Sequence, residues 1–280
     1  MHIIFNLKTL IFCLKSRRDI VIPVAFTGLA ASLIDDARTA HSRFGLTVPI
    51  LNDSSSNLSE QSEEAQFIRR AKLIIWDEAS MASKYAYETV DRLLQMITHV
   101  NSPFGGYVFL LTGDFRQTLP VVKHGTPAQI ISESMTSSYL WPIFKQFSLK
   151  TNMRANEADA EFQDWLLRLG EGRLHTIDPD QELIEIPAQC LVDSVDELIR
   201  FVYGEQLIPF DQENVRRAIL SPKNQQVDQI NDRILNLLDG ETKTYHSADS
   251  LISEDRDLDE ANFPVELINS YTPSGFPPQS

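Results

Sequence analysis

Residues 73–81 read Leu73-Ile74-Ile75-Trp76-Asp77-Glu78-Ala79-Ser80-Met81, an apolar run that ends in two adjacent carboxylates, a small residue and a hydroxyl. The apolar part predicts a strand that is buried on both faces, as in parallel sheets. Ligands of such sheets bind beyond the carboxyl ends of the strands. There Asp77 can hold a magnesium ion, usually through water, and Glu78 can orient or deprotonate an attacking water. The alternative is a carboxylate pair that merely opens a surface helix.

The composition is typical of a globular protein. The 280 residues suffice for one large or two medium domains, and 42% of them are hydrophobic and 9% aromatic. The two cysteines, Cys13 and Cys190, show no pairing pattern. They therefore support neither a disulfide framework nor a zinc site, and they favour a reducing compartment. No segment reaches the roughly 18 apolar residues of a membrane span, so no membrane partner is expected.

The charge distribution restricts where a nucleic acid can bind. A net charge of −14 argues against a general electrostatic attraction to DNA. However, residues 181–280 hold 19 acidic and 7 basic residues, a balance of −12, which leaves residues 1–180 near neutrality. A DNA site in the first part of the chain is therefore allowed.

The first fourteen residues are apolar enough to suggest a signal peptide. Lys8 interrupts the apolar core, no positive region precedes it, and no small-residue cleavage site follows closely. The apolar residues at 3, 4, 7, 10, 11 and 14 follow helical spacing instead. We therefore interpret the segment as a buried helix.

Strands and helices are predicted to alternate along the chain. The expected helices cover 3–16, a short stretch after Thr27-Gly28, 84–99, 193–203 and 224–238, and the expected strands cover 20–26, 73–76, 107–111 and 217–220. This alternation indicates an α/β fold with a parallel sheet. A change of composition at 176–179 suggests a domain boundary.

A second polar stretch follows the predicted strand at 107–111. Gly113 allows a tight turn, and Gln117 follows it closely. The Gln117 amide can bond a γ-phosphate oxygen and an attacking water, which would distinguish a triphosphate from a diphosphate. The alternative is a turn in which Asp114 caps a short helix and Gln117 is solvated.

Two further groups have the residue types for phosphate contacts. An arginine placed just after a strand can reach across a cleft and stabilise phosphoryl charge, which makes Arg154 a candidate, or it can form an ordinary surface ion pair. Around Thr27-Gly28 and Arg38–Phe44, hydroxyls, small residues, arginines and His41 suit contacts to a sugar-phosphate strand. Phe44 can stack on a base, whereas His41 can equally be a histidine bonded inside the fold.

Taken in order, these motifs resemble the PIF-type (petite integration frequency) DNA helicases, including those of Helitron-like elements. The similar segments span nearly the whole chain: 24–44, 75–81, 104–106, 113–122, 152–154, 220–224, 227, 230–231, 245–250, 266–270 and 273–277. The resemblance implies the RecA-like parallel α/β sheets of a superfamily-one helicase. Residues 1–176 would form the first RecA-like domain and residues 177–280 a partial second one.

The resemblance implies an ATP-dependent helicase that moves 5′ to 3′ on single-stranded DNA and unwinds duplex DNA, with roles in telomere maintenance, recombination and repair. Four residues would serve hydrolysis: Asp77 holding magnesium, Glu78 activating water, Gln117 sensing the γ-phosphate of ATP, and Arg154 acting as an arginine finger. Contacts to DNA would come from Thr27, Gly28, His41 and Asn224. We expect a monomer in the nucleus or, alternatively, the mitochondrion.

The sequence departs from the family in lacking a phosphate-binding loop of the form Gly-x-x-x-x-Gly-Lys-Ser/Thr. Lys8 and Lys15 lie in the first predicted helix without a glycine loop, so neither can substitute. We therefore expect a chain truncated at both ends, without the loop and its preceding strand and without the last helicase motifs. The adjacent Asp35 and Asp36, beside the DNA-facing segment, would repel phosphate.

Two hypotheses follow from the missing loop. The chain is an incomplete part of a helicase whose activity belongs to a longer protein, or it is a non-enzymatic remnant of a Helitron-like mobile element. An unrelated RecA-type ATPase is a more distant possibility. DNA just upstream of the first codon would separate the first two hypotheses, because only a helicase gene would encode an in-frame Gly-Lys-Thr there.

Overall fold

The computed structural model describes residues 2–122, 124–149, 160–178, 183–205, 216–238, 240 and 243. The chain divides into two compact units, residues 1–176 and residues 177–280. Among the helices that the structure describes, none combines the length and apolar composition that a membrane crossing requires.

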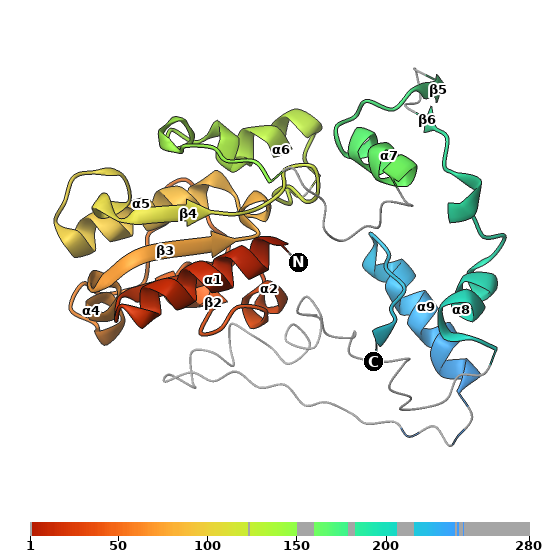
Figure 1. Ribbon diagram of the computed structural model, residues 1–280, viewed down its shortest axis with the longest axis horizontal. Coiled ribbons are helices and arrows are strands. Elements are labelled where there is room, and N and C mark those ends of the chain that lie inside the picture. The colour runs from red at the N-terminus through yellow and green to blue at the C-terminus, as the bar shows by residue number, and fades with distance from the viewer. Residues whose placement is uncertain are drawn as a thin grey trace, which may run out of the picture. The chain divides into compact units, whose positions relative to one another are not determined.

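The first unit is built on a four-stranded parallel sheet in the order β2-β1-β3-β4. Figure 1 shows β3 and β4 of this sheet lying side by side. The strands are β1 (Ile20–Ala25), β2 (Arg38–Thr39), β3 (Ala71–Asp77) and β4 (Val108–Leu111). Ala25 of β1 lies opposite Asp77 of β3, and Leu111 of β4 lies opposite Trp76, one residue earlier in β3. All four strands therefore end at the same edge of the sheet.

Both faces of the central strand β3 are covered. Leu73 and Ile75 pack with Leu7 and Ile11 of α1 (His2–Ser16) in one cluster. Ile74 and Trp76 point to the other face, into the larger core. This alternation follows from the two-residue period of a strand and confirms the prediction of a strand buried on both sides.

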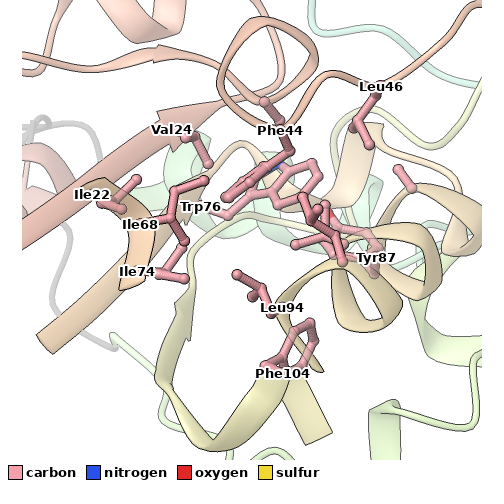
Figure 2. Close-up of a cluster of buried hydrophobic side chains, with 14 of the residues drawn as sticks. Ile22, Val24, Phe44, Leu46, Ile68, Ile74, Trp76, Tyr87, Leu94 and Phe104 are labelled. Atoms are coloured by element: carbon pink, nitrogen blue, oxygen red, sulfur yellow. The ribbon is translucent and has the colours of Figure 1, made fainter. Parts of the chain in front are cut away.

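The larger core lies on the face opposite α1 and is built mainly from α3 (Ala40–Phe44), α4 (Glu63–Arg69) and α5 (Lys84–Thr98). Helix α5 carries apolar residues at helical spacing, and its inner face is buried. Figure 2 shows Phe44, Trp76 and Tyr87 grouped in this core, together with Leu94 and Phe104. Phe44 is fully buried there, so the expectation that it stacks on a base is wrong.

A tight turn places β4 beside β3. The 3₁₀ helix η2 (Pro103–Gly106) precedes β4, and Gly105 adopts a φ of +60° there. A Cβ atom on Gly105 would lie 2.5 Å from the carbonyl oxygen of Leu94 in α5. Glycine is therefore required both by the backbone conformation and by the close approach to α5.

The remaining elements of the first unit connect or follow the sheet. They are α2 (Gly28–Ser32), η1 (Ala79–Met81), α6 (Pro127–Glu133), η3 (Met135–Ser137), η4 (Trp141–Ile143) and α7 (Ala160–Gly170). The expected helices at 3–16 and 84–99, and the expected strands of this unit, are present within one or two residues at most ends. The α/β fold with a parallel sheet is therefore confirmed.

The second unit contains β6 (Leu183–Ile184), η6 (Ala188–Cys190), α8 (Val195–Tyr203) and α9 (Asn224–Leu237), and β5 (Thr176–Asp178) pairs with β6. The predicted helices at 193–203 and 224–238 are present. The predicted strand at 217–220 is wrong, because these residues have no strand partner among the described residues. Ile219 and Leu220 instead line a cavity together with residues of α8 and α9.

Candidate functional site

Three of the parallel strands deliver the candidate site residues to one edge of the sheet. The backbone N–H of Phe26, just beyond β1, donates to the carbonyl oxygen of Asp77 at 3.3 Å. The N–H of Thr112, just beyond β4, donates to the carbonyl oxygen of Trp76 at 2.9 Å. The hydrogen bonding of the sheet thus extends one residue beyond the ends of β1 and β4, and both neighbouring strands hold the end of β3.

The Asp77 side chain is only 5% exposed. Its Oδ1 accepts a 2.6 Å hydrogen bond from the hydroxyl of Thr112. A buried carboxylate is costly unless hydrogen bonds stabilise it. Thr112 therefore compensates part of this cost and fixes the orientation of the carboxylate at the strand end.

Glu78 has a left-handed backbone, with φ +53° and ψ +41°. This conformation costs a non-glycine residue about 1–2 kcal/mol, so the neighbouring structure must hold it. Ala79 provides that support, because its N–H donates to the Thr112 carbonyl oxygen at 2.8 Å and its own carbonyl accepts from the Tyr87 hydroxyl at 2.5 Å. The turn after Asp77 is therefore fixed from β4 on one side and from α5 on the other.

Gly113 brings the chain after β4 against this turn. A Cβ atom there would lie 3.0 Å from the backbone nitrogen of Ser80, closer than side chains normally approach. The predicted need for glycine at this position is thus explained by a close backbone approach rather than by a positive φ.

Beyond Gly113, Asp114 organises a charged turn. Its carboxylate accepts hydrogen bonds from Arg116 Nε at 2.8 Å and from Gln117 Nε2 at 3.2 Å. Burial raises the pKa of Asp114, but the bonds from Arg116 and Gln117 outweigh it, and the pKa lies below its ordinary value. Arg116 also lies 3.8 Å from Glu171, which directly follows α7. Gln117 itself is exposed, as in the solvated-turn alternative, although no helix forms there.

The segments expected to face DNA follow β1 and β2 at the same edge. Thr27 caps α2, with its Oγ1 accepting from the Ala30 N–H at 3.2 Å, and Gly28 is the exposed first residue of that helix. His41 is half-buried and lies edge-on to Phe26, with ring centroids 5.8 Å apart. Burial lowers the pKa of His41, so the neutral imidazole is favoured.

Not all of the nearby charges are available to a ligand. Arg43 is 7% exposed and forms an ion pair with Glu64. Asp35 and Asp36 lie within ion-pair distance of Lys8 and Lys15 of α1, respectively. These lysines offset the expected repulsion between the two carboxylates and a phosphate backbone.

The oxygen donors at this edge are of the kind that magnesium accepts. Asp77 contributes one buried carboxylate and Thr112 a hydroxyl. Within the described ranges, no cluster of three or more His, Cys, Asp or Glu side chains is suited to a metal ion. Mg²⁺ is typically bound through one or two carboxylates, waters and substrate phosphates, so the donor set agrees with a nucleotide-bound ion.

The structure brings together only some of the predicted site residues. Asp77, Glu78, Thr27 and His41 share the carboxyl edge of the sheet, whereas Asn224 begins α9 in the second unit. Arg154 lies outside the described residues. Thr112 and Tyr87 carry no signal in the sequence for a role at this site, because only the fold brings them to their partners Asp77 and Ala79.

Comparisons with known proteins agree with this geometry. A family model described as PIF1-like helicase matches residues 4–180. The ATP-dependent DNA helicase Pif1 of Psychrobacter sp. (strain PRwf-1) is 27% identical over 245 residues, which cover 87% of this chain and 34% of the relative. The ATP-dependent DNA helicase PIF1 of Emericella nidulans is 27% identical over 242 residues, covering 84% of this chain and 29% of the relative. The chain thus spans about a third of the length of these curated relatives.

Solved structures show the same fold. The crystal structure of Pif1 helicase from Candida albicans superposes with a TM-score of 0.62 at 22% identity, covering 92% of this chain and 54% of that one. Pif1 helicase from Bacteroides, in complex with ADP-AlF3 and ssDNA, gives a TM-score of 0.57 at 21% identity, covering 79% of this chain and 48% of that one. The predicted RecA-like α/β fold is therefore confirmed.

Proposed function

The chain belongs to the PIF1-like helicase family, and from this premise we propose that it serves an ATP-dependent DNA helicase that moves 5′ to 3′ and unwinds duplex DNA. The observation that carries the proposal is the position of Asp77 and Glu78. They lie at the carboxyl edge of a parallel sheet, where the bond from Thr112 and the bonds to Ala79 hold them. This edge is where ligands of such sheets bind.

Each residue at this edge has a distinct proposed role in hydrolysis. Asp77, oriented by Thr112, holds magnesium, which when bound neutralises charge on the phosphates of ATP. Glu78 accepts a proton from the attacking water or orients that water. Its left-handed backbone places it beyond the strand end and out of the buried core, where Asp77 remains.

Gln117 and Arg154 are proposed to read the γ-phosphate. The Gln117 amide donates to Asp114 in this structure, so it is held in a turn directly after β4. Bidentate contact from Arg154 would stabilise charge on the transferred phosphoryl group.

Single-stranded DNA is proposed to bind along α2 and α3, with contacts from Thr27, Gly28 and His41, and in the second unit with Asn224. The exposed backbone at Gly28 and the neutral imidazole of His41 suit hydrogen bonds to phosphate and sugar rather than a purely ionic attraction. The net charge of −14 is consistent with a local contact surface of this kind.

The cellular role follows from the family only. We propose participation in telomere maintenance, recombination and repair, as a monomer in the nucleus or alternatively in the mitochondrion. We also propose that the 280 residues alone hydrolyse ATP negligibly, because their sequence contains no phosphate-binding loop.

A pair of measurements tests this proposal. The 280-residue chain should bind a fluorescently labelled oligo-dT by anisotropy but show no DNA-stimulated ATP hydrolysis. A chimera in which the strand and phosphate-binding loop of a PIF1-like relative precede Met1 should regain DNA-stimulated hydrolysis. The Glu78→Gln change should then reduce that turnover by about 100-fold or more, the range of a lost general base.

Two results would contradict the proposal. Turnover of the unextended chain that disappears in Glu78→Gln would show that the loop is not needed. A chimera that hydrolyses ATP without any response to DNA would indicate an unrelated RecA-type ATPase instead.

The second candidate function is a non-enzymatic remnant of a Helitron-like mobile element. The observation behind it is that the 280 residues contain no Gly-x-x-x-x-Gly-Lys-Ser/Thr sequence. Sequencing full-length transcripts of the gene distinguishes the two candidates, because only the helicase requires an in-frame Gly-Lys-Thr upstream of the first codon.

A further inference from the structure

Ala79, the residue that follows Glu78, is bonded on both sides to other elements. Its N–H reaches the Thr112 carbonyl beyond β4, and its carbonyl receives the Tyr87 hydroxyl from α5. Tyr87 is fully buried, and burial raises the pKa of its hydroxyl well above the ordinary value. The hydroxyl therefore remains protonated and able to donate at any physiological pH.

The ring of Tyr87 belongs to an aromatic stack that crosses the core. Its centroid lies 4.5 Å from that of Trp76, and Trp76 lies 6.1 Å from Phe44 with the two ring planes 25° apart. All three side chains are fully buried, and Figure 2 shows them side by side. Close-packed aromatic contacts of this kind transmit displacements because the interior has little free volume.

The far end of the stack lies in α3. Phe44 is the last residue of this helix, and His41 lies one turn earlier. His41 also contacts Phe26, whose N–H bonds to the carbonyl of Asp77. Helix α3 is therefore linked by direct contacts to both sides of Glu78: through Phe26 to Asp77, and through the stack to Ala79.

We propose that Tyr87 is a positioning residue for Glu78, and that the Phe44–Trp76–Tyr87 stack communicates the binding of single-stranded DNA at α3 to the turn that carries Glu78. This inference rests on the proposed function, because it takes α3 as part of the DNA surface. The left-handed Glu78 makes the turn a suitable receiver, since its conformation is maintained by bonds from neighbouring elements rather than by its own preference.

Hydrogen exchange of the 280-residue chain tests the link without requiring ATP hydrolysis. Binding of oligo-dT is followed by anisotropy, and exchange is followed in peptides spanning residues 77–82. In the wild-type protein, saturating oligo-dT should change the exchange rate of these amides by about fivefold, the factor that corresponds to one net hydrogen bond. In Tyr87→Phe, which keeps the ring and loses the hydroxyl, this DNA-dependent ratio should fall to near one.

The control is Tyr85→Phe, an identical change two residues away. The Tyr85 ring lies 5.2 Å from the Lys84 ammonium group at the start of α5, and Tyr85 is only partly buried. It should leave both the oligo-dT affinity and the exchange ratio unchanged. A purely structural role of Tyr87 would speed exchange in the free protein but would preserve the ratio, so the ratio separates the two roles.

A second variant keeps the proposal testable if Tyr87→Phe does not fold. Phe44→Leu preserves an apolar side chain and removes the stack, and it should reduce the ratio in the same way. Trp76 offers an independent signal: in a Trp141→Phe, Trp165→Phe background its emission should shift on addition of oligo-dT, and Phe44→Leu should abolish the shift.

The outcomes distinguish the inference from the proposed function. Tight oligo-dT binding with the same exchange ratio in the wild type and in both variants would overturn the link while leaving DNA binding intact. Absence of oligo-dT binding would overturn the proposed DNA surface and the link with it.

Discussion

The hydroxyl of Thr112 donates a 2.6 Å hydrogen bond to the carboxylate of Asp77 across the ends of β4 and β3. The two residues are 35 positions apart in the chain and meet only because β3 and β4 pair in parallel register. The bond joins the strand that carries the proposed magnesium ligand to the strand that leads into the Gln117 turn.

Replacing Thr112 by valine tests the importance of this bond. Valine has nearly the same shape but no hydroxyl, and it leaves the buried Asp77 without its donor. We expect a loss of about 1.5–3 kcal/mol in the free energy of unfolding, the range for hydrogen bonds to charged groups. Thr112→Ser, which retains the hydroxyl, should lose less than half as much in urea titrations. A larger loss in Thr112→Ser than in Thr112→Val would contradict this expectation, because it would show that the methyl group contributes more to stability than the hydrogen bond.

Gly105 and Gly106 form a matched pair for testing the turn before β4. Both have positive φ, +60° and +80°, so alanine costs each about 1–2 kcal/mol for the backbone alone. At Gly105 the new Cβ would also lie 2.5 Å from the Leu94 carbonyl oxygen, whereas at Gly106 the nearest atom is 3.6 Å away. Gly105→Ala should therefore destabilise the protein by about 1–3 kcal/mol more than Gly106→Ala in thermal or urea unfolding.

Sequence patterns predict those parts of the fold that are set by local periodicity. The apolar run before Asp77 and the helical spacing of α5 each identify their element, because burial on two faces or on one face leaves a distinct pattern. The strand predicted at 217–220 fails because its apolar run is too short to leave such a distinct pattern. An apolar triplet such as Ala218-Ile219-Leu220 fits a strand equally well as it fits a loop that lies against two helices.

The candidate site was only partly predictable. The adjacent carboxylates of Asp77 and Glu78 mark the strand end in the sequence itself. The bonds that orient them depend on the pairing register, which brings in Thr112, and on the packing of α5, which brings in Tyr87. No local signal encodes such contacts. A hydroxyl directly after the next parallel strand is the nearest indication that the sequence offers for Thr112.

His41 should make the stability depend on pH. Burial lowers its pKa in the folded protein below the ordinary value of 6.5, so the unfolded chain binds the proton more strongly. Stability is therefore complete above about pH 6.5 and falls as the pH is lowered through the folded pKa. In His41→Gln the slope of unfolding free energy between about pH 5 and 7 should decrease. The same substitution at the exposed His124 serves as the control for the change of residue type.

Asp114 should also make the stability of the protein depend on pH, in a lower pH range than His41 does. Its pKa is depressed: burial raises it, but the hydrogen bonds from Arg116 and Gln117 outweigh that effect. A depressed carboxyl pKa contributes stability that is present above the ordinary value of 3.8 and is lost as the pH falls through the folded pKa. Asp114→Asn should therefore be less stable than the wild type at neutral pH, and the difference should shrink on acidification.

The Asp114 turn can be tested further by changing the partner. Arg116→Lys keeps the positive charge but loses the planar donor pair that contacts Asp114 through Nε and Nη2, so it should reproduce part of the Asp114→Asn effect.

Gln117→Ala removes only one neutral donor and should have a smaller effect on unfolding. If Gln117 senses the γ-phosphate, this same change should abolish DNA-stimulated hydrolysis in the loop-restored chimera while leaving urea stability within about 0.5 kcal/mol of the wild type. Loss of stability without loss of hydrolysis would instead assign Gln117 to the turn alone.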